Sequence, residues 1–319
     1  MRERQAAKFS RAFQFKTANS QLISREGILI RSRDRVNSLW SYGEASPVNG
    51  HSAESIEKCW DYLNGKSKEA PASVRFALDT EARWPEILLG PATPVKSNAV
   101  IDLDIKLERV EALVEMGYRT FKLKVSPKNA TEVLDLMKAI IGCGIDPAFR
   151  LDASASFDQK SIIELARVLG DFPVEYIEDP CAPDFVAWNE LHALGLSVAV
   201  DQGLISIETI ENMLEKYPFT VGVLKPTVLG GEREIRAAAA LLERAGKRTV
   251  LTSSLETEIG RASVISLAAK LLPNETHGVS TGRFFSENFL PDRALYRGPL
   301  VFDPRWSEFV ASLVWERIA

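Results

Sequence analysis

The sequence has few of the residues that mark disulfide-rich, cysteine-zinc or membrane proteins. Its three cysteines, Cys59, Cys143 and Cys181, lie far apart and lack C-x-x-C spacing, which argues against a disulfide framework or a cysteine zinc site. Reduced thiols are typical of the cytosol, so we expect a cytoplasmic protein. No apolar run approaches the ~20 residues that cross a bilayer, and the polar residues 1–10 do not resemble a signal peptide.

The sequence also lacks an excess of charge of one sign. Its 39 lysines and arginines face 43 aspartates and glutamates, for a net charge of −4. This balance gives no electrostatic footprint of a nucleic-acid-binding protein. Histidines are few, and the three present, His51, His192 and His277, show no ligand spacing. We therefore expect a globular protein with a large core and with no nucleic-acid or membrane partner.

The middle of the chain alternates short apolar runs with helical patterns. The runs are apolar on both faces, which is typical of parallel strands covered by helices. Strands are predicted at Asn98–Leu103, Thr120–Val125, Ala148–Ala153, Val174–Asp179, Ser197–Asp201, Thr220–Lys225, Arg248–Ser253 and Gly278–Thr281.

Helical spacing fills the segments between these strands. One example runs from Ile162 to Leu169, with Asp158 as a possible cap near its start and Gly170 at its end. Alternating strands and helices of this number predict an α/β fold, a parallel barrel that closes on itself. A doubly wound open sheet is the alternative, but the G-x-G-x-x-G and P-loop motifs of many such folds are missing.

The two ends of the chain do not follow this alternation. We expect an α+β domain at residues 1–95, the barrel at 96–283, and a segment at 284–319 that returns to the first domain. The first domain is predicted to hold strands at 13–16, 27–32 and 36–39, the last leading into Tyr42-Gly43-Glu44, and helices at 55–63 and 74–82.

Charged residues stand at the ends of five successive predicted strands, where a β/α barrel has its active site. In chain order they are Lys122 with Lys124, Asp152, Glu178, Asp201 and Lys225. Three neighbouring strands thus each deliver a carboxylate to one rim, and neighbouring strands lie only ~4.8 Å apart. Crowded carboxylates repel one another unless a cation joins them. Hard oxygen ligands favour Mg²⁺, with Mn²⁺ as its substitute.

The lysines add acid-base chemistry to this rim. Lys122 and Lys124 have the period-two spacing of a strand, so both point to one side of it. Inside the barrel, Lys122 would make Lys124 release its proton more readily, because like charges disfavour a second ammonium. Lys225, four strands further round, would face them. The set suits removal of the proton α to a metal-held carboxylate, so we expect a small-molecule carboxylate substrate.

Each of these residues also has an ordinary explanation. A single carboxylate at a strand end often caps a helix, a K-x-K pair is common on an exposed edge strand, and Ser253 and Ser254 fit an ordinary loop. Chance would have to place Lys, Asp, Glu, Asp and Lys at the same end of five successive units. The joint pattern therefore favours a catalytic site.

The pattern resembles the enolase superfamily, and within it the muconate-lactonizing subgroup, which has K-x-K on the second strand and a lysine on the sixth. The resemblance covers most of the chain. It implies a (β/α)7β TIM-like barrel with an N-terminal α+β capping domain. It also implies Mg²⁺ bound by Asp152, Glu178 and Asp201.

Two stretches, Tyr42–Pro47 and Ser253–Glu256, are similar to the o-succinylbenzoate synthase family of menaquinone biosynthesis, as is Gly260 on the turn into the following helix. The resemblance implies a metal-dependent lyase. It would dehydrate 2-succinyl-6-hydroxy-2,4-cyclohexadiene-1-carboxylate to 2-succinylbenzoate by syn elimination.

The same resemblance implies a role for each group. Lys124 would abstract the α proton and protonate the leaving hydroxyl, while Lys225 would stabilise the enediolate and Lys122 would tune Lys124. Segments 17–25 and 47–52 would close over the substrate and exclude water. Contacts with the substrate are expected at Ser253, Ser254 and Glu256.

Two positions depart from the family pattern, and alternatives stay open. Ser154 stands where the family often has Asn, and Gln202 where it often has Glu; both would orient ligands and tune the metal. An N-succinyl amino acid racemase or a muconate-type cycloisomerase would use the same scaffold. Dipeptide epimerases tend to carry D-x-D at the eighth strand, and Gly278–Arg283 has no such pair. A catalytically silent barrel that acts as a binding protein is the alternative of another class.

Overall fold

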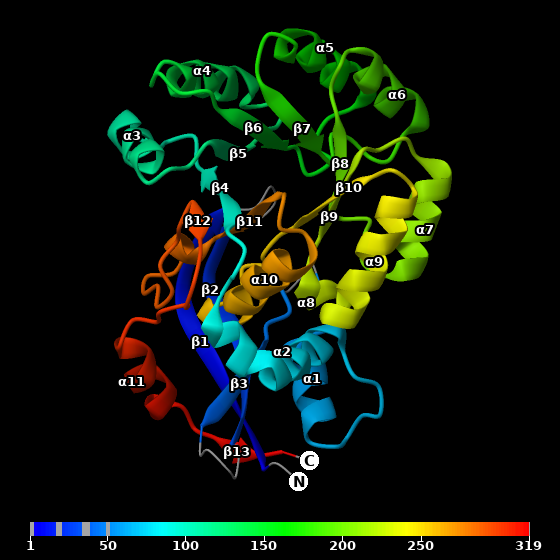
Figure 1. Cartoon of the computed structure of the whole chain (residues 1–319). Helices are drawn as coiled ribbons and strands as arrows, with labels where there is room; N and C mark the ends of the chain where they lie inside the picture. The colour runs from blue at the N-terminus through cyan, green and yellow to red at the C-terminus, as the bar shows by residue number, and fades with distance from the viewer. Residues whose placement is uncertain (1–2, 17–20, 34–38, 49–51, 319) are drawn as a thin grey trace.

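Two sheets organise the computed structural model, which describes residues 3–16, 21–33, 39–48 and 52–318. One is a four-stranded sheet in the order β13-β1-β2-β3, and the other is built on eight parallel strands that run round a barrel. Figure 1 shows the barrel strands ringed by helices, with the smaller sheet packed beside them. We call the smaller sheet and its helices α1 and α2 the cap.

Long antiparallel strands form the cap sheet. The strands predicted at 13–16 and 27–32 are confirmed, but the pairing of β1 with β2 extends from Arg4↔Ser32 to Lys16↔Gln21. Most of the strand predicted at 36–39 lies outside the described residues. The cap strands are β1 (Arg4–Lys16), β2 (Gln21–Arg33), β3 (Trp40–Ala45) and β13 (Glu316–Arg317).

Helices α1 (Ile56–Leu63) and α2 (Ala72–Leu89) confirm the two predicted cap helices, although α2 continues seven residues past its predicted end at Ala82. Gly43 of β3 allows α2 to lie close against the sheet, since a Cβ there would stand 1.9 Å from the carbonyl oxygen of Ala77. The cap is therefore packed tightly where it carries the Tyr42-Gly43-Glu44 stretch.

The barrel confirms the predicted α/β fold class. Its strands follow the order β10-β9-β8-β7-β6-β5-β4-β11. An isolated parallel bridge between Thr252 and Gly278 nearly closes the ring. The strands are β4 (Val95–Ile101), β5 (Thr120–Lys124), β6 (Ala148–Asp152), β7 (Val174–Glu178), β8 (Val198–Val200), β9 (Val221–Leu224), β10 (Arg248–Leu251) and β11 (Thr276–Ser280). The first of them begins and ends earlier than predicted.

Helices cover the outer face of the barrel (Figure 1). Asp158 caps the N-terminus of α5 and Gly170 ends it, as predicted. None of the helices in the described part is long and apolar enough to cross a membrane. The barrel helices are α3 (Leu107–Glu115), α4 (Ala130–Ile141), α5 (Gln159–Leu169), α6 (Phe185–Ala193), α7 (Ile207–Lys216), α8 (Pro226–Leu229), α9 (Glu232–Arg244) and α10 (Glu258–Leu271).

Alternation along the strands decides which side chains enter the barrel. Ile177 and Val200 belong to the large core shared with the helices. Tyr176, Ala199 and Val223 instead form a small buried cluster drawn from strands alone, inside the barrel. Side chains two positions apart on a strand point the same way. Glu178, Asp201 and Lys225, each two positions after one of these residues, therefore point toward the same interior.

The C-terminal segment ties the barrel to the cap. It forms β12 (Leu295–Tyr296), which pairs with β4 of the barrel, then α11 (Arg305–Ser312), and finally β13, which pairs with β1 of the cap. The boundaries predicted for the two domains stay predictions.

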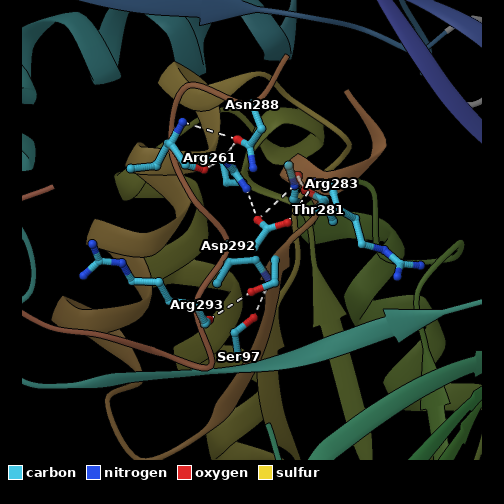
Figure 2. A network of polar contacts seen from close by, with 12 residues as sticks. Ser97, Arg261, Thr281, Arg283, Asn288, Asp292 and Arg293 are labelled. Carbon is cyan, nitrogen blue, oxygen red and sulfur yellow. Dashed lines mark hydrogen bonds and ion pairs between the residues drawn. The ribbon is translucent and has the colours of Figure 1, made fainter. Parts of the chain in front are cut away.

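Asp292 fastens this segment to the end of β11. It accepts hydrogen bonds from the backbone nitrogens of Gly282, at 3.0 Å, and Arg283, at 2.8 Å, and pairs with Arg261 of α10. Figure 2 shows the network, in which Arg261 also donates to Asn288 at 2.7 Å. Through Asp292, the buried guanidinium of Arg261 thus holds the residues that follow the last barrel strand.

The close approach at Gly43 predicts a specific loss of stability. Gly43→Ala should lower the free energy of unfolding by about 1–3 kcal/mol, because the methyl group would collide with the α2 backbone. Urea unfolding measures this loss. Gly170→Ala is the matched control, since its backbone is helical and the nearest atom to its Cβ is 3.9 Å away; an equal loss in both variants would contradict the packing argument.

Candidate active site

Three barrel strands bring the predicted charged residues side by side. Lys124 of β5 lies opposite Asp152 of β6, and Asp152 lies opposite Glu178 of β7. Lys122 and Lys124 alternate with Phe121 and Leu123, which belong to the core under the helices. The two lysines therefore face away from that core, toward the barrel interior.

Lys122 joins two of the carboxylates. Its Nζ lies 2.6 Å from Oε1 of Glu178 and 3.2 Å from Oδ2 of Asp152. Glu178 is almost fully buried, and such a group is costly to ionise without a partner of opposite charge. The ammonium supplies that partner for both carboxylates.

Lys225 holds the third carboxylate from the neighbouring strand. It follows β9 directly and pairs with Oδ2 of Asp201, which follows β8. The charge of Asp201 raises the pKa of Lys225 against the effect of burial, and Glu178 adds to that rise. The two lysine–carboxylate groups thus share one electrostatic environment.

The carboxylates differ in how they hold their charge. Burial raises the pKa of Glu178 to about 8, and the charges of Asp152 and Asp201 add to the rise against the opposing effect of Lys122. Burial also favours the neutral form of Asp152, but Lys122 and Lys124 outweigh it and lower its pKa to about 2. Glu178 is therefore harder to ionise than Asp152.

The donor set fits a divalent cation. Oε2 of Glu178 and Oδ1 of Asp201 are buried and have no hydrogen-bond partner among the described residues. Buried carboxylate oxygens of this kind are hard ligands that suit Mg²⁺. As they stand, no three His, Cys, Asp or Glu side chains in the described ranges are arranged to hold a metal ion, and the paired carboxylate oxygens are oriented toward the lysines.

Asp179 is a site residue that the sequence reasoning missed. Its carboxylate accepts hydrogen bonds from the backbone nitrogens of Asp201, at 3.2 Å, and Gln202, at 3.1 Å. It is buried in a left-handed backbone conformation with φ of 42°, which few residues other than Gly, Asn and Asp adopt readily. Asp179 thus fixes the chain that carries Asp201. The signal lay in the Glu178-Asp179-Pro180 run at the strand end.

The two positions expected to orient ligands differ in the structure. Ser154 donates from its hydroxyl to Oδ1 of Asp152 at 2.8 Å, and from its backbone nitrogen to the same atom at 3.1 Å. Gln202 meets the site through its backbone nitrogen, which donates to Asp179, and the residue is exposed. A tuning role for either residue stays a prediction.

The loop after β10 is held by a buried glutamate. Glu256 accepts hydrogen bonds from the Ser253 hydroxyl at 2.5 Å, from the Ser254 nitrogen at 2.8 Å, and from Thr227. The Glu256 carboxylate therefore positions the two serines. Contacts of Ser253, Ser254 and Glu256 with a substrate stay predictions.

The cap meets the barrel at the start of α10. Glu44 of β3 accepts hydrogen bonds from the backbone nitrogens of Thr257, at 2.8 Å, and Gly260, at 2.9 Å. Backbone N–H groups at the start of a helix have no partner within the helix, and a carboxylate that accepts from them stabilises the helix. Gly260 lies inside α10, and not on a turn leading into it, and a Cβ there would meet Glu256 at 2.5 Å. Of the two segments expected to close over the substrate, residues 21–25 belong to β2, whereas 17–20 and 49–51 lie outside the described residues.

Known proteins share this architecture. The chain is 26% identical over 249 residues to an o-succinylbenzoate synthase of Thermobifida fusca (strain YX), covering 77% of this chain and 72% of that protein. The Mg complex of o-succinylbenzoate synthase from Thermosynechococcus elongatus BP-1 has a similar fold, with a TM-score of 0.74 at 21% identity over 97% of this chain and 99% of that one. The N-succinyl Arg/Lys racemase of Bacillus cereus ATCC 14579 gives 0.80 at 16% identity over 100% of both chains.

Sequence similarity also extends to a family. Residues 106–303, more than half of the chain, match the family described as enolase C-terminal domain-like. The match spans β5 to β11 and so includes the strands that carry the lysines and the carboxylates. The chain therefore belongs to the enolase superfamily.

Proposed function

We propose that the chain is a Mg²⁺-dependent o-succinylbenzoate synthase that dehydrates 2-succinyl-6-hydroxy-2,4-cyclohexadiene-1-carboxylate to 2-succinylbenzoate. One observation carries the proposal. Ammonium groups from two walls of the barrel and carboxylates from the three strands between them share one interior surface. The relative from Thermobifida fusca that bears this name adds support.

Asp152, Glu178 and Asp201 would hold the metal ion, with Mn²⁺ able to replace Mg²⁺. When bound, it would hold the substrate carboxylate and stabilise the negative charge that develops on that group as the α proton leaves. The unpaired oxygens of Glu178 and Asp201 are suited to this role, since a buried oxygen without a partner gains most from a cation.

Lys124 would move the proton. Its neutral amine would accept the proton α to the carboxylate, and the C–H electron pair would become the new ring double bond as the hydroxyl leaves. The resulting ammonium would return that proton to the hydroxyl on the same face, which departs as water and completes a syn elimination. Lys122, held beside Glu178, would keep a positive charge near Lys124, and Lys225 would stabilise the developing negative charge from the opposite wall.

An N-succinyl amino acid racemase is the second candidate. Racemisation needs one acid-base group on each face of the α carbon, and Lys225 stands four strands round the barrel from Lys124. Purified protein assayed with the cyclohexadiene substrate and with a panel of N-succinyl amino acids separates the two activities. Turnover of muconate would indicate a cycloisomerase. A protein that neither turns over a substrate nor exchanges its α proton in D₂O would be a silent barrel.

Lys124→Ala should abolish turnover, a loss of at least about 10²-fold in kcat, because it removes the base. Circular dichroism and Mg²⁺ affinity should change little, since Lys124 is not a proposed ligand. Steady-state assays measure the effect. Lys128→Ala, at an exposed position just after the same strand, serves as the control. Near-normal activity in the Lys124 variant would refute the acid-base role.

Asp201→Asn should weaken Mg²⁺ binding by at least about tenfold, because it replaces a charged oxygen ligand by a neutral amide. Calorimetric titration of Mg²⁺ measures the affinity directly. Asp135→Asn, at an exposed carboxylate on α4, is the matched control and should bind like the wild type. An Asp201 variant with unchanged affinity would remove this residue from the ligand set.

A further inference from the structure

Arg25 of the cap is buried and directed at the barrel loop that carries the two serines. It lies on β2, and only 4% of its surface is exposed. Its guanidinium donates to five backbone carbonyl oxygens, of Leu255 at 2.8 Å, Pro47 at 3.0 Å, Glu26 at 3.2 Å, Ser254 at 3.3 Å, and Ser46. One side chain thus joins the cap to the Ser253–Leu255 turn, 230 residues further along the chain.

This turn needs support from outside itself. Leu255 has a left-handed backbone with φ of 63°, which costs a side chain such as leucine roughly 1–2 kcal/mol. The Leu255 nitrogen donates to the Ser253 hydroxyl at 3.0 Å, and Glu256 holds the Ser254 nitrogen from the barrel side. Arg25 holds the carbonyls of the same turn from the cap side.

The turn presents two different surfaces at the mouth of the barrel. Leu255 packs against the buried cluster of Phe13, Phe284 and Phe285, as does Val100, so cap and barrel residues meet there. Only 6% of the surface of Ser254 is exposed. Its hydroxyl is buried and has no hydrogen-bond partner within the described part of the chain. A buried hydroxyl without a partner is costly, which is tolerable where a ligand supplies the missing hydrogen bond.

We propose that Arg25 is a positioning residue for substrate binding: it holds the Ser253–Leu255 turn in its left-handed form and thereby sets where the Ser254 hydroxyl can meet the substrate. The proposal rests on the proposed function for the site itself. It adds that a cap residue outside that site controls the site's affinity. A guanidinium suits this task, because its planar fork can serve several carbonyls at once.

Arg25→Met tests the proposal, with Arg11→Met as its matched control. Arg11 is a second buried arginine of the cap that reaches the barrel, but it pairs with Glu258 of α10, at 2.7 Å, and not with the turn. Both variants should lose stability. Arg25→Met alone should raise KM at least about tenfold with kcat within about threefold, the pattern of lost binding. Arg11→Met should keep KM within about twofold.

Amide hydrogen exchange gives a readout that does not depend on turnover. Exchange in peptides covering residues 250–256 should become faster in Arg25→Met and stay unchanged in Arg11→Met, since of these two arginines only Arg25 donates to that segment. If the wild type turns over none of the assayed substrates, the proposed function fails and exchange alone decides this inference.

The results that overturn the inference are definite. The inference is overturned if Arg25→Met shows wild-type exchange in residues 250–256. It is also overturned if the KM and the exchange of Arg25→Met do not differ from those of Arg11→Met. If Arg25→Met does not fold, Arg25→Lys replaces it and should show a smaller change of the same kind, because an ammonium has three donors for five carbonyls. Wild-type exchange in Arg25→Lys would also overturn the inference.

Discussion

The balance of charge inside the barrel is the constraint on which the rest of this structure depends. Glu178 and Asp201 are taken largely out of water, and each is held by a lysine from another strand. An ion pair in such a place is worth little unless its remaining oxygens are also satisfied, and two of them are not. The site thus keeps buried carboxylate oxygens without partners, an arrangement that costs stability but suits the binding of a divalent cation.

The register and alternation of the parallel barrel strands bring these charged side chains together. Parallel strands in register place Lys124, Asp152 and Glu178 in adjacent positions. Alternation sends their neighbours Leu123, Leu151 and Ile177 to the core beneath the helices. Packing of the outer core therefore fixes the direction of the charged side chains, and Glu44 joins the cap to the barrel at the start of α10.

The sequence predicts those features that repeat with the period of a strand or a helix. The fold class follows from such periods and the ends of α5 from the residue types of Asp158 and Gly170, and both are confirmed. Asp179 and Arg25 could not be found in this way, because their roles depend on backbone atoms of distant segments. The length of the cap strands was underestimated for a related reason, since pairing between β1 and β2 extends beyond the apolar runs. The roles of the lysines and carboxylates stay predictions.

Anomalous diffraction from a crystal soaked in Mn²⁺ tests the central claim most directly, because Mn²⁺ takes the same oxygen ligands as Mg²⁺. The account predicts one strong anomalous peak within about 2.5 Å of carboxylate oxygens of Asp152, Glu178 and Asp201, with the ammonium of Lys122 moved away from Glu178. Density that leaves both lysine–carboxylate pairs intact, with no peak between them at saturating Mn²⁺, would contradict it.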